Sequence, residues 1–206
     1  MYARSTTIRG NPQQMDDGIA YTRDSVMPAV LQIDGCVGIS MLCDREDGRC
    51  IVTTAWEDHD AMVNSRESVR PIRERAVEVL GGRPEVNEWE IAILHRMQQT
   101  PEGGCARITW TTGDAGALDR SVEDFKASVM PRVERLDGFC SLSMLIDRET
   151  GRAVIAASYE NRAALDAASG QVQAMRDEFD LRMNRQVTDI AVMEVALAHL
   201  RVPETV

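Results

Sequence analysis

The chain has 206 residues, of which 44% are hydrophobic and 27% are charged, and its net charge is −10. This charge would repel a phosphate backbone and no cluster of Lys and Arg offsets it, so we expect no nucleic-acid partner. No apolar run approaches the roughly 18 residues that a membrane helix needs, and the first residues contain no signal-peptide core. We therefore expect a cytoplasmic protein without a membrane partner.

Short segments of the sequence recur 103 residues later. Val26–Pro28 returns as Val129–Pro131, and Ser40–Leu42 returns as Ser143–Leu145. Such a constant spacing indicates a duplication, and a unit of about 100 residues is large enough to form its own core. The expected parts are a first repeat over 1–99, a linker over 100–104 and a second repeat over 105–206.

Each repeat predicts the order strand, helix, strand, strand, helix, strand. The expected ranges in the first repeat are 2–8, 13–33, 36–43, 50–57, 58–80 and 88–96. Pro28 falls inside the first helical range and Pro131 repeats it, so we expect a kink or break in both repeats. Gly48 is placed for a positive φ in the hairpin turn, and Asp58 offers an N-cap for the second helix.

This order of elements is typical of the ferredoxin-like α+β fold, in which two helices cover one face of an antiparallel sheet. Alternation along the second strand places Val37, Ile39 and Met41 under the helices, with Ser40 and Leu42 on the opposite face. That mixed face suits another sheet better than water. We therefore expect the two ferredoxin-like βαββαβ repeats to close sheet to sheet as an α/β barrel within one chain.

The five cysteines are an odd number, and none of them has the C-x-x-C spacing. Three of them are replaced by Ala, Ile or Phe at the matching position of the other repeat, as buried small hydrophobic residues often are. We expect reduced thiols in the core, with neither a disulfide framework nor a metal site.

One stretch of sequence, Ile51–Met62, resembles the third strand and the following helix start of the antibiotic-biosynthesis-monooxygenase-like (ABM) dimeric α/β-barrel proteins. Val154–Leu165 is a weaker copy, so the chain is similar to a homodimer of that family fused into one polypeptide. The resemblance implies either a monomeric pseudo-dimer or a homodimer. Members of the family include cofactor-independent monooxygenases of polyaromatic substrates, heme-degrading enzymes and proteins without known activity.

Heme degradation is disfavoured by the residues at the positions where the resemblance would place the heme site. That branch of the family uses Asn on the first strand, Trp on the second helix and His further along that helix. Thr6, Ser65 and a region around Glu74 stand there in the first repeat. We expect no cofactor.

Four residues are candidates for a ligand cleft between helices and sheet: Asn64, Trp56, His59 and Tyr159. The resemblance implies a phenolic substrate held by Asn, Trp, Tyr and Arg side chains that stabilise its anion. Asn64, Trp56 and His59 occur only in the first repeat, so we expect a single functional cleft there. A buried aromatic residue in a hydrophobic core is the alternative for Trp56 and Tyr159.

Two charged residues are repeated on neighbouring strands. Arg4 matches Arg107 on the first strand, and Glu90 matches Glu194 on the last strand, where the spacing is one residue longer. Each Arg is expected to meet its Glu across the sheet. The pair would orient a polar substrate or serve as a structural salt bridge that sets the register.

His95 and His199 also match, at the outer end of the last strand. Histidine is a natural general base near neutral pH. A structural histidine is the alternative, because no neighbouring carboxylate motif identifies an orienting partner.

Two functions follow from these patterns. The first is a site for a small hydrophobic or aromatic molecule, with cofactor-independent oxygenation of an aromatic or polyketide-like metabolite. The second is a binding or assembly module of the same fold without catalysis.

Overall fold

The computed structural model describes residues 1–200, which form an α+β fold with eight strands. The strands are hydrogen-bonded in the order β1-β3-β2-β8-β5-β7-β6-β4 as a closed antiparallel barrel, which confirms the predicted fold class. The strands are β1 (Tyr2–Arg9), β2 (Cys36–Asp44), β3 (Arg49–Trp56), β4 (Pro84–Arg96), β5 (Cys105–Thr112), β6 (Phe139–Asp147), β7 (Arg152–Tyr159) and β8 (Gln186–Leu200).

The described residues group into two compact units. The first unit contains residues 1–89 and the end of β8 from Glu194, and the second contains Glu90 to Met193. In the first unit the end of β8 pairs with β2, and in the second the end of β4 pairs with β6. The repeats expected at 1–99 and 105–206 therefore describe the duplicated sequence, whereas each compact unit takes part of its last strand from the other repeat; residues 201–206 lie outside the described range.

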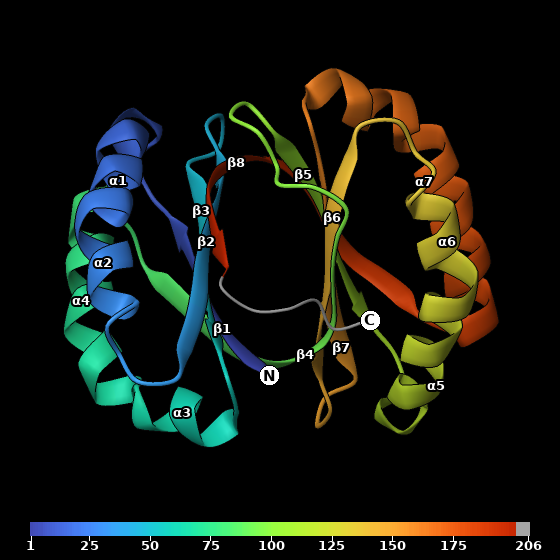
Figure 1. The fold of residues 1–206 in the computed structure, drawn as a ribbon, viewed down its shortest axis with the longest axis horizontal. Helices are drawn as coiled ribbons and strands as arrows, with labels where there is room; N and C mark the ends of the chain where they lie inside the picture. The colour runs from blue at the N-terminus through green and yellow to red at the C-terminus, as the bar shows by residue number, and fades with distance from the viewer. Residues whose placement is uncertain (201–206) are drawn as a thin grey trace. The chain divides into compact units, whose positions relative to one another are not determined.

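Helices cover one face of the strands in each unit (Figure 1). The helices are α1 (Met15–Tyr21), α2 (Met27–Val30), α3 (His59–Asn64) and α4 (Arg66–Leu80) in the first unit, and α5 (Leu118–Asp124), α6 (Met130–Val133) and α7 (Arg162–Met183) in the second. The predicted apolar face of β2 is buried beneath them, with Val37 at 7%, Ile39 at 2% and Met41 at 0% exposure. No helix within residues 1–200 is long and apolar enough to cross a lipid bilayer.

The break predicted at the two prolines is present in both units. A π-helical segment, Thr22–Val26 or Phe125–Val129, precedes the short helix that contains Pro28 or Pro131. A proline has no amide hydrogen for the carbonyl four residues earlier, so the backbone takes a wider turn there. The first predicted helix, 13–33, is therefore a series of short helical pieces.

The hairpin of the first unit agrees with its prediction. Asp44 and Arg49 pair across the turn, and Gly48 has the positive φ of 71° that a side chain would disfavour. The matching Gly151 has a φ of 73°. Asp58 caps α3 by accepting a hydrogen bond from the Ala61 amide at 2.8 Å.

The second helix differs between the units. We predicted one helix from Asp58 to about Leu80, but the first unit has two helices that meet at Ser65, while α7 is continuous. The Met62 carbonyl accepts hydrogen bonds from the Ser65 hydroxyl at 2.7 Å and from Arg4 at 2.6 Å. Because this carbonyl is occupied by side chains, the helix opens there, and Pro71 further removes a donor from α4.

Candidate functional site

A cleft lies between α7 and the strands of the second unit. The space within it, including the open solvent at its mouth, is about 640 Å³. Its apolar walls come from Phe125, Val129, Val133, Leu142, Ile155, Ala157, Val172, Met175 and Phe179. Its polar lining residues are Arg107, Thr109, Thr111, Tyr159, Arg176 and Asp180.

Tyr159 lies at the end of β7 and is 1% exposed, yet no described residue hydrogen-bonds its hydroxyl group. Burial raises the pKa of Tyr159 to about 12, and the positive charge of Arg107 opposes this rise. Its ring meets Phe139 edge to face, with 6.0 Å between the centroids. A buried hydroxyl without a partner is costly, so this group is a candidate hydrogen-bond donor to a ligand.

Arg107 comes from β5, where its Cα pairs with that of Ala157. Its side chain is half-buried and lines the cleft, and no residue within 1–200 forms a hydrogen bond or ion pair with it. A guanidinium group presents several donors in a fixed plane and prefers oxyanions. Arg107 and Tyr159 together therefore form a donor end of the cleft.

Another part of the cleft contains Thr111 and Asp180. Arg185 donates to the Thr111 hydroxyl from Nη2 at 2.9 Å and to the Gly151 carbonyl at 3.0 Å. Burial raises the pKa of Asp180, while the positive charges of Arg176 and Arg185 oppose this rise. The cleft therefore has an acidic group apart from its Arg107–Tyr159 donor end.

The counterpart of Arg107 in the first unit, Arg4, is fully bonded. It donates to the Glu88 carboxylate at 3.0 Å, to the Ser65 hydroxyl at 2.9 Å and to the Met62 carbonyl at 2.6 Å. Its guanidinium carbon also lies 6.0 Å from the centroid of the Trp56 ring. Burial lowers the pKa of Arg4, and the bond to Glu88 offsets part of this change.

The residues that hydrogen-bond Arg4 and Trp56 in the first unit are replaced in the second. Ala168 stands where Ser65 is, and Val192 stands where Glu88 is. The Trp56 indole donates to the Thr54 hydroxyl at 3.0 Å, and this threonine is replaced by Ala157. The substitutions that remove these partners leave polar groups of the second cleft available to a ligand.

The four cleft candidates from the sequence lie in different surroundings. Tyr159 lines the cleft, but Trp56 is a core residue with 0% exposure. Asn64 and His59 are exposed, and His59 packs edge to face on the Tyr2 ring at 5.2 Å. Only Tyr159 of these four is among the residues that line the cleft of the second unit.

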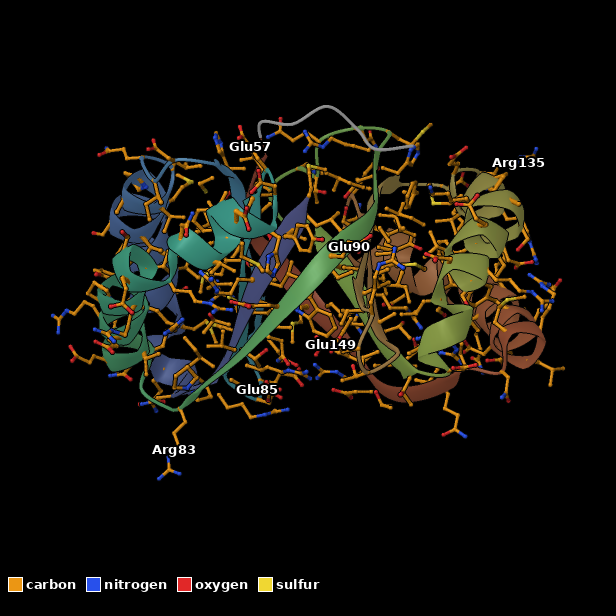
Figure 2. All side chains as sticks on the ribbon, turned by 90° about the horizontal axis from the view of Figure 1, so that it is seen from below. Glu57, Arg83, Glu85, Glu90, Arg135 and Glu149 are labelled. Atoms are coloured by element: carbon orange, nitrogen blue, oxygen red, sulfur yellow. The ribbon has the colours of Figure 1, made fainter. Side chains whose placement is uncertain are left out.

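The predicted pairing of Arg4 with Glu90 is wrong. Glu90, labelled in Figure 2, lies in the part of β4 that pairs with β6. Its carboxylate accepts a hydrogen bond from Arg148 of the β6–β7 turn at 2.9 Å. Arg148 also binds Asp119 of α5 at 2.7 Å. Strand register therefore brings this glutamate to the hairpin turn.

An equivalent arginine with two carboxylate partners occurs in the first unit. Arg45 binds Glu194 at 2.6 Å and Asp16 of α1 at 2.6 Å. The predicted pair of Arg107 with Glu194 is therefore also wrong. Both glutamates bind an arginine of a hairpin turn in place of Arg4 or Arg107.

The two histidines differ in burial. His95 is 9% exposed and its Nε2 lies 3.3 Å from Glu134 Oε1, although the angles do not meet those of a hydrogen bond. Its Cα pairs with that of Leu142, which lines the cleft, but His95 itself is not among the lining residues. His199 is half-buried on β8.

None of the described cysteines forms a disulfide bond. Cys43 and Cys50 pair across the first hairpin with 3.3 Å between their sulfur atoms, and both are buried. Within residues 1–200 no group of three His, Cys, Asp or Glu side chains is arranged to hold a metal ion.

Sequence reasoning did not identify Thr111 and Asp180. Both stand where the first repeat has an apolar residue, since Ile8 matches Thr111 and Val77 matches Asp180. This exchange of an apolar for a polar residue between repeats was the available signal. At these two positions the second unit has a polar side chain where the first unit has a hydrophobic one.

Two proteins of Mycobacterium tuberculosis (strain ATCC 25618 / H37Rv) are similar to the whole chain. The uncharacterised protein Rv2557 is 48% identical over 206 residues, which cover all of this chain and 92% of that protein. The uncharacterised protein Rv2558 is 46% identical over 207 residues, covering all of this chain and 88% of that protein. No protein-family model matches the chain.

Solved structures share the fold at low sequence identity. A protein from Lactobacillus acidophilus proposed to be a monooxygenase has a TM-score of 0.72 and 10% identity, over 97% of this chain and 96% of its own. An anthrone oxidase-like protein has a TM-score of 0.68 and 9% identity, over 99% of this chain and 94% of that protein. A ferredoxin-fold protein of Listeria monocytogenes related to antibiotic biosynthesis monooxygenases has a TM-score of 0.54 and 6% identity, over 95% and 94%. The chain thus belongs to the family of the mycobacterial proteins Rv2557 and Rv2558, and it has the ABM-like dimeric α/β-barrel fold.

Proposed function

We propose that the protein binds one small aromatic molecule in the cleft of the second unit, through an oxygen that bears negative charge when the molecule is ionised, and oxygenates it without a bound cofactor. The observation that carries this proposal is the presence of two unpartnered donors, Arg107 and Tyr159, in a cleft with apolar walls. The proposal moves the site from the first repeat, where the sequence led us to expect it, to the second.

The cleft provides the interactions that such a ligand needs. Its aliphatic and aromatic walls favour ring systems, and a half-buried guanidinium favours an oxyanion more strongly than it would in bulk water. The Tyr159 hydroxyl keeps its proton at neutral pH, because burial raises its pKa to about 12, so it acts as a hydrogen-bond donor. Both donors stabilise negative charge on the same ligand oxygen.

Oxygenation without a cofactor is chemically possible when the ligand itself supplies the electrons. A methylene flanked by aromatic rings loses a proton to give a delocalised anion, which reduces dioxygen. One oxygen atom enters the ring as a carbonyl and the other leaves as water, with the two methylene hydrogens. The similarity in fold to an anthrone oxidase-like protein supports this reaction class. The lining residues include no histidine, the axial ligand that heme degradation requires in this family.

Ligand binding can be tested with two molecules of nearly equal shape, 2-naphthoate and neutral 2-naphthamide, by isothermal titration calorimetry. A charge-assisted hydrogen bond of about 1.5–3 kcal/mol predicts roughly ten- to hundredfold tighter binding of the carboxylate. Arg107→Met should remove this preference and Arg107→Lys should keep part of it. Arg162→Met changes the same charge on the exposed start of α7 and serves as the control. Equal affinities for the two probes in the unmodified protein would contradict the proposed site.

Turnover can be tested with anthrone, by oxygen uptake and by the appearance of anthraquinone. The proposal predicts one dioxygen consumed for each anthrone, with loss of the enzymatic rate in Arg107→Met. Selective binding of 2-naphthoate without any acceleration of anthrone oxidation would favour the noncatalytic binding module instead.

A further inference from the structure

Asp180 is a carboxylate placed in the wall of the cleft on the last turns of α7. It is half-buried, and no residue within 1–200 forms a hydrogen bond or an ion pair with its carboxylate. A carboxylate at the edge of an apolar cleft is costly when nothing binds it. Its position therefore needs a reason other than the stability of the empty protein.

The charged groups around Asp180 are bound to other partners. Arg176, one turn earlier on α7, pairs with Asp177 at 2.8 Å. Arg185 is buried and donates to Thr111 and to the Gly151 carbonyl. Burial, with the negative charge of Asp177, raises the pKa of Asp180, while the positive charges of Arg176 and Arg185 oppose this rise.

The first unit shows that the fold does not require an acid at this position. Val77 is the counterpart of Asp180, and Ile8 is the counterpart of Thr111. Asp180 therefore occurs in the unit whose arginine is free and is absent from the unit whose arginine is bonded. Two independent differences between the repeats thus meet in one cleft.

We infer that Asp180 is the general base of the second-unit cleft and takes a proton from a carbon atom of the bound aromatic ligand. This inference rests on the proposed function, because Arg107 and Tyr159 must hold the oxygen on which the resulting charge gathers. In this step a C–H bond breaks and an O–H bond forms at the Asp180 carboxylate. The bonding electron pair enters the ring system and reaches the ligand oxygen. No oxidant takes part in this step.

Proton abstraction can be measured without oxygenation. Anthrone in deuterated buffer without dioxygen takes up deuterium at its methylene carbon, and proton NMR follows the loss of that signal. The protein should accelerate this exchange, and Asp180→Asn should lower the accelerated rate at least a hundredfold, to the rate in buffer. The acceleration should increase with pH as Asp180 ionises, and the variant should lose this dependence. Asp166→Asn, at an exposed acid near the start of the same helix, should leave the rate unchanged.

Binding of 2-naphthoate separates this inference from the proposed function. Asp180→Asn should bind this probe within about threefold of the unmodified protein, because Arg107 and Tyr159 remain. If the variant binds the probe and still exchanges at the original rate, Asp180 is not the base. If the unmodified protein binds the probe but does not accelerate exchange, the inference is also overturned while the binding site stands. If the unmodified protein does not bind the probe at all, the proposed function fails first and the inference falls with it.

Discussion

Arg107 is the counterpart of Arg4 in the duplicated chain, but the two arginines have opposite surroundings. Arg4 is 3% exposed and donates to Glu88, Ser65 and the Met62 carbonyl. Arg107 forms no hydrogen bond or ion pair with any residue in the described range 1–200. One copy of this arginine therefore stabilises its unit, and the other is available to a ligand.

The first prediction compares the stability of two matched variants. Arg4→Met should lower the free energy of unfolding by about 1.5–3 kcal/mol, because it removes the charge-assisted hydrogen bonds of a buried guanidinium. Arg107→Met should change it by less than about 1 kcal/mol. Denaturation in guanidinium chloride, followed by circular dichroism, measures both values. Equal losses in the two variants would show that Arg107 has a structural role like that of Arg4.

The second prediction concerns the Tyr159 hydroxyl. Tyr159→Phe should raise the free energy of unfolding of the empty protein by up to about 1 kcal/mol, because it removes a buried hydroxyl that has no partner. The same variant should weaken the binding of 2-naphthoate. Tyr21→Phe, at a half-buried position outside the cleft, should change neither property and serves as the control. A loss of stability in Tyr159→Phe would reveal a hydrogen bond that the empty cleft is not expected to make.

The third prediction is a pH dependence of stability that comes from Asp180. Burial raises the pKa of this carboxyl group in the folded protein, and in the unfolded chain the pKa is about 3.9. Above about pH 4 the unfolded chain releases the proton more readily, so stability falls as pH rises until the folded-state pKa is passed. The side chain introduced by Asp180→Asn does not ionise, so this variant does not lose folding stability as pH rises through that range.

Unfolding of the protein and of Asp180→Asn should be measured between pH 3 and pH 8. The difference in free energy should be constant below about pH 4, grow in favour of the variant above it, and then level off. A difference that grows in favour of the unmodified protein would indicate an ion pair that holds Asp180 in the folded state.

The fourth prediction concerns the thiols. Cys43, Cys50 and Cys140 are buried, whereas Cys36 and Cys105 are half-buried. The hydrogen bond with Cys50 and burial raise the pKa of Cys43, and only the thiolate is a good nucleophile. Ellman's reagent should therefore modify Cys36 and Cys105 first in the folded protein, and the other three only after unfolding. Rapid modification of Cys43 would show that the first hairpin opens readily.

Much of the fold could be predicted because the sequence states its pattern twice. The hairpin between β2 and β3, its turn at Gly48 and the break before Pro28 each follow from local chemistry. The interruption of the second helix at Ser65 could not be predicted. It depends on Arg4, which reaches the Met62 carbonyl from a distant strand.

The site was harder to predict because it depends on which polar side chains have no hydrogen-bond partner in the folded protein. Arg107 and Tyr159 were candidates, but only their surroundings show that they lack bonding partners. The expected pairs of Arg4 with Glu90 and Arg107 with Glu194 failed because strand register carries both glutamates to hairpin turns. Asn64 was selected from its position in the resemblance, and its side chain is exposed.

The central claim is a single ligand site in the second unit, and a crystal structure of the complex with 2-naphthoate tests it most directly. The account predicts one naphthoate molecule in the cleft, with its rings against Val172 and its carboxylate bonded to Arg107 and Tyr159. A naphthoate bound in the first unit beside Arg4, or a second-unit cleft that stays without the probe while calorimetry shows binding, would contradict it.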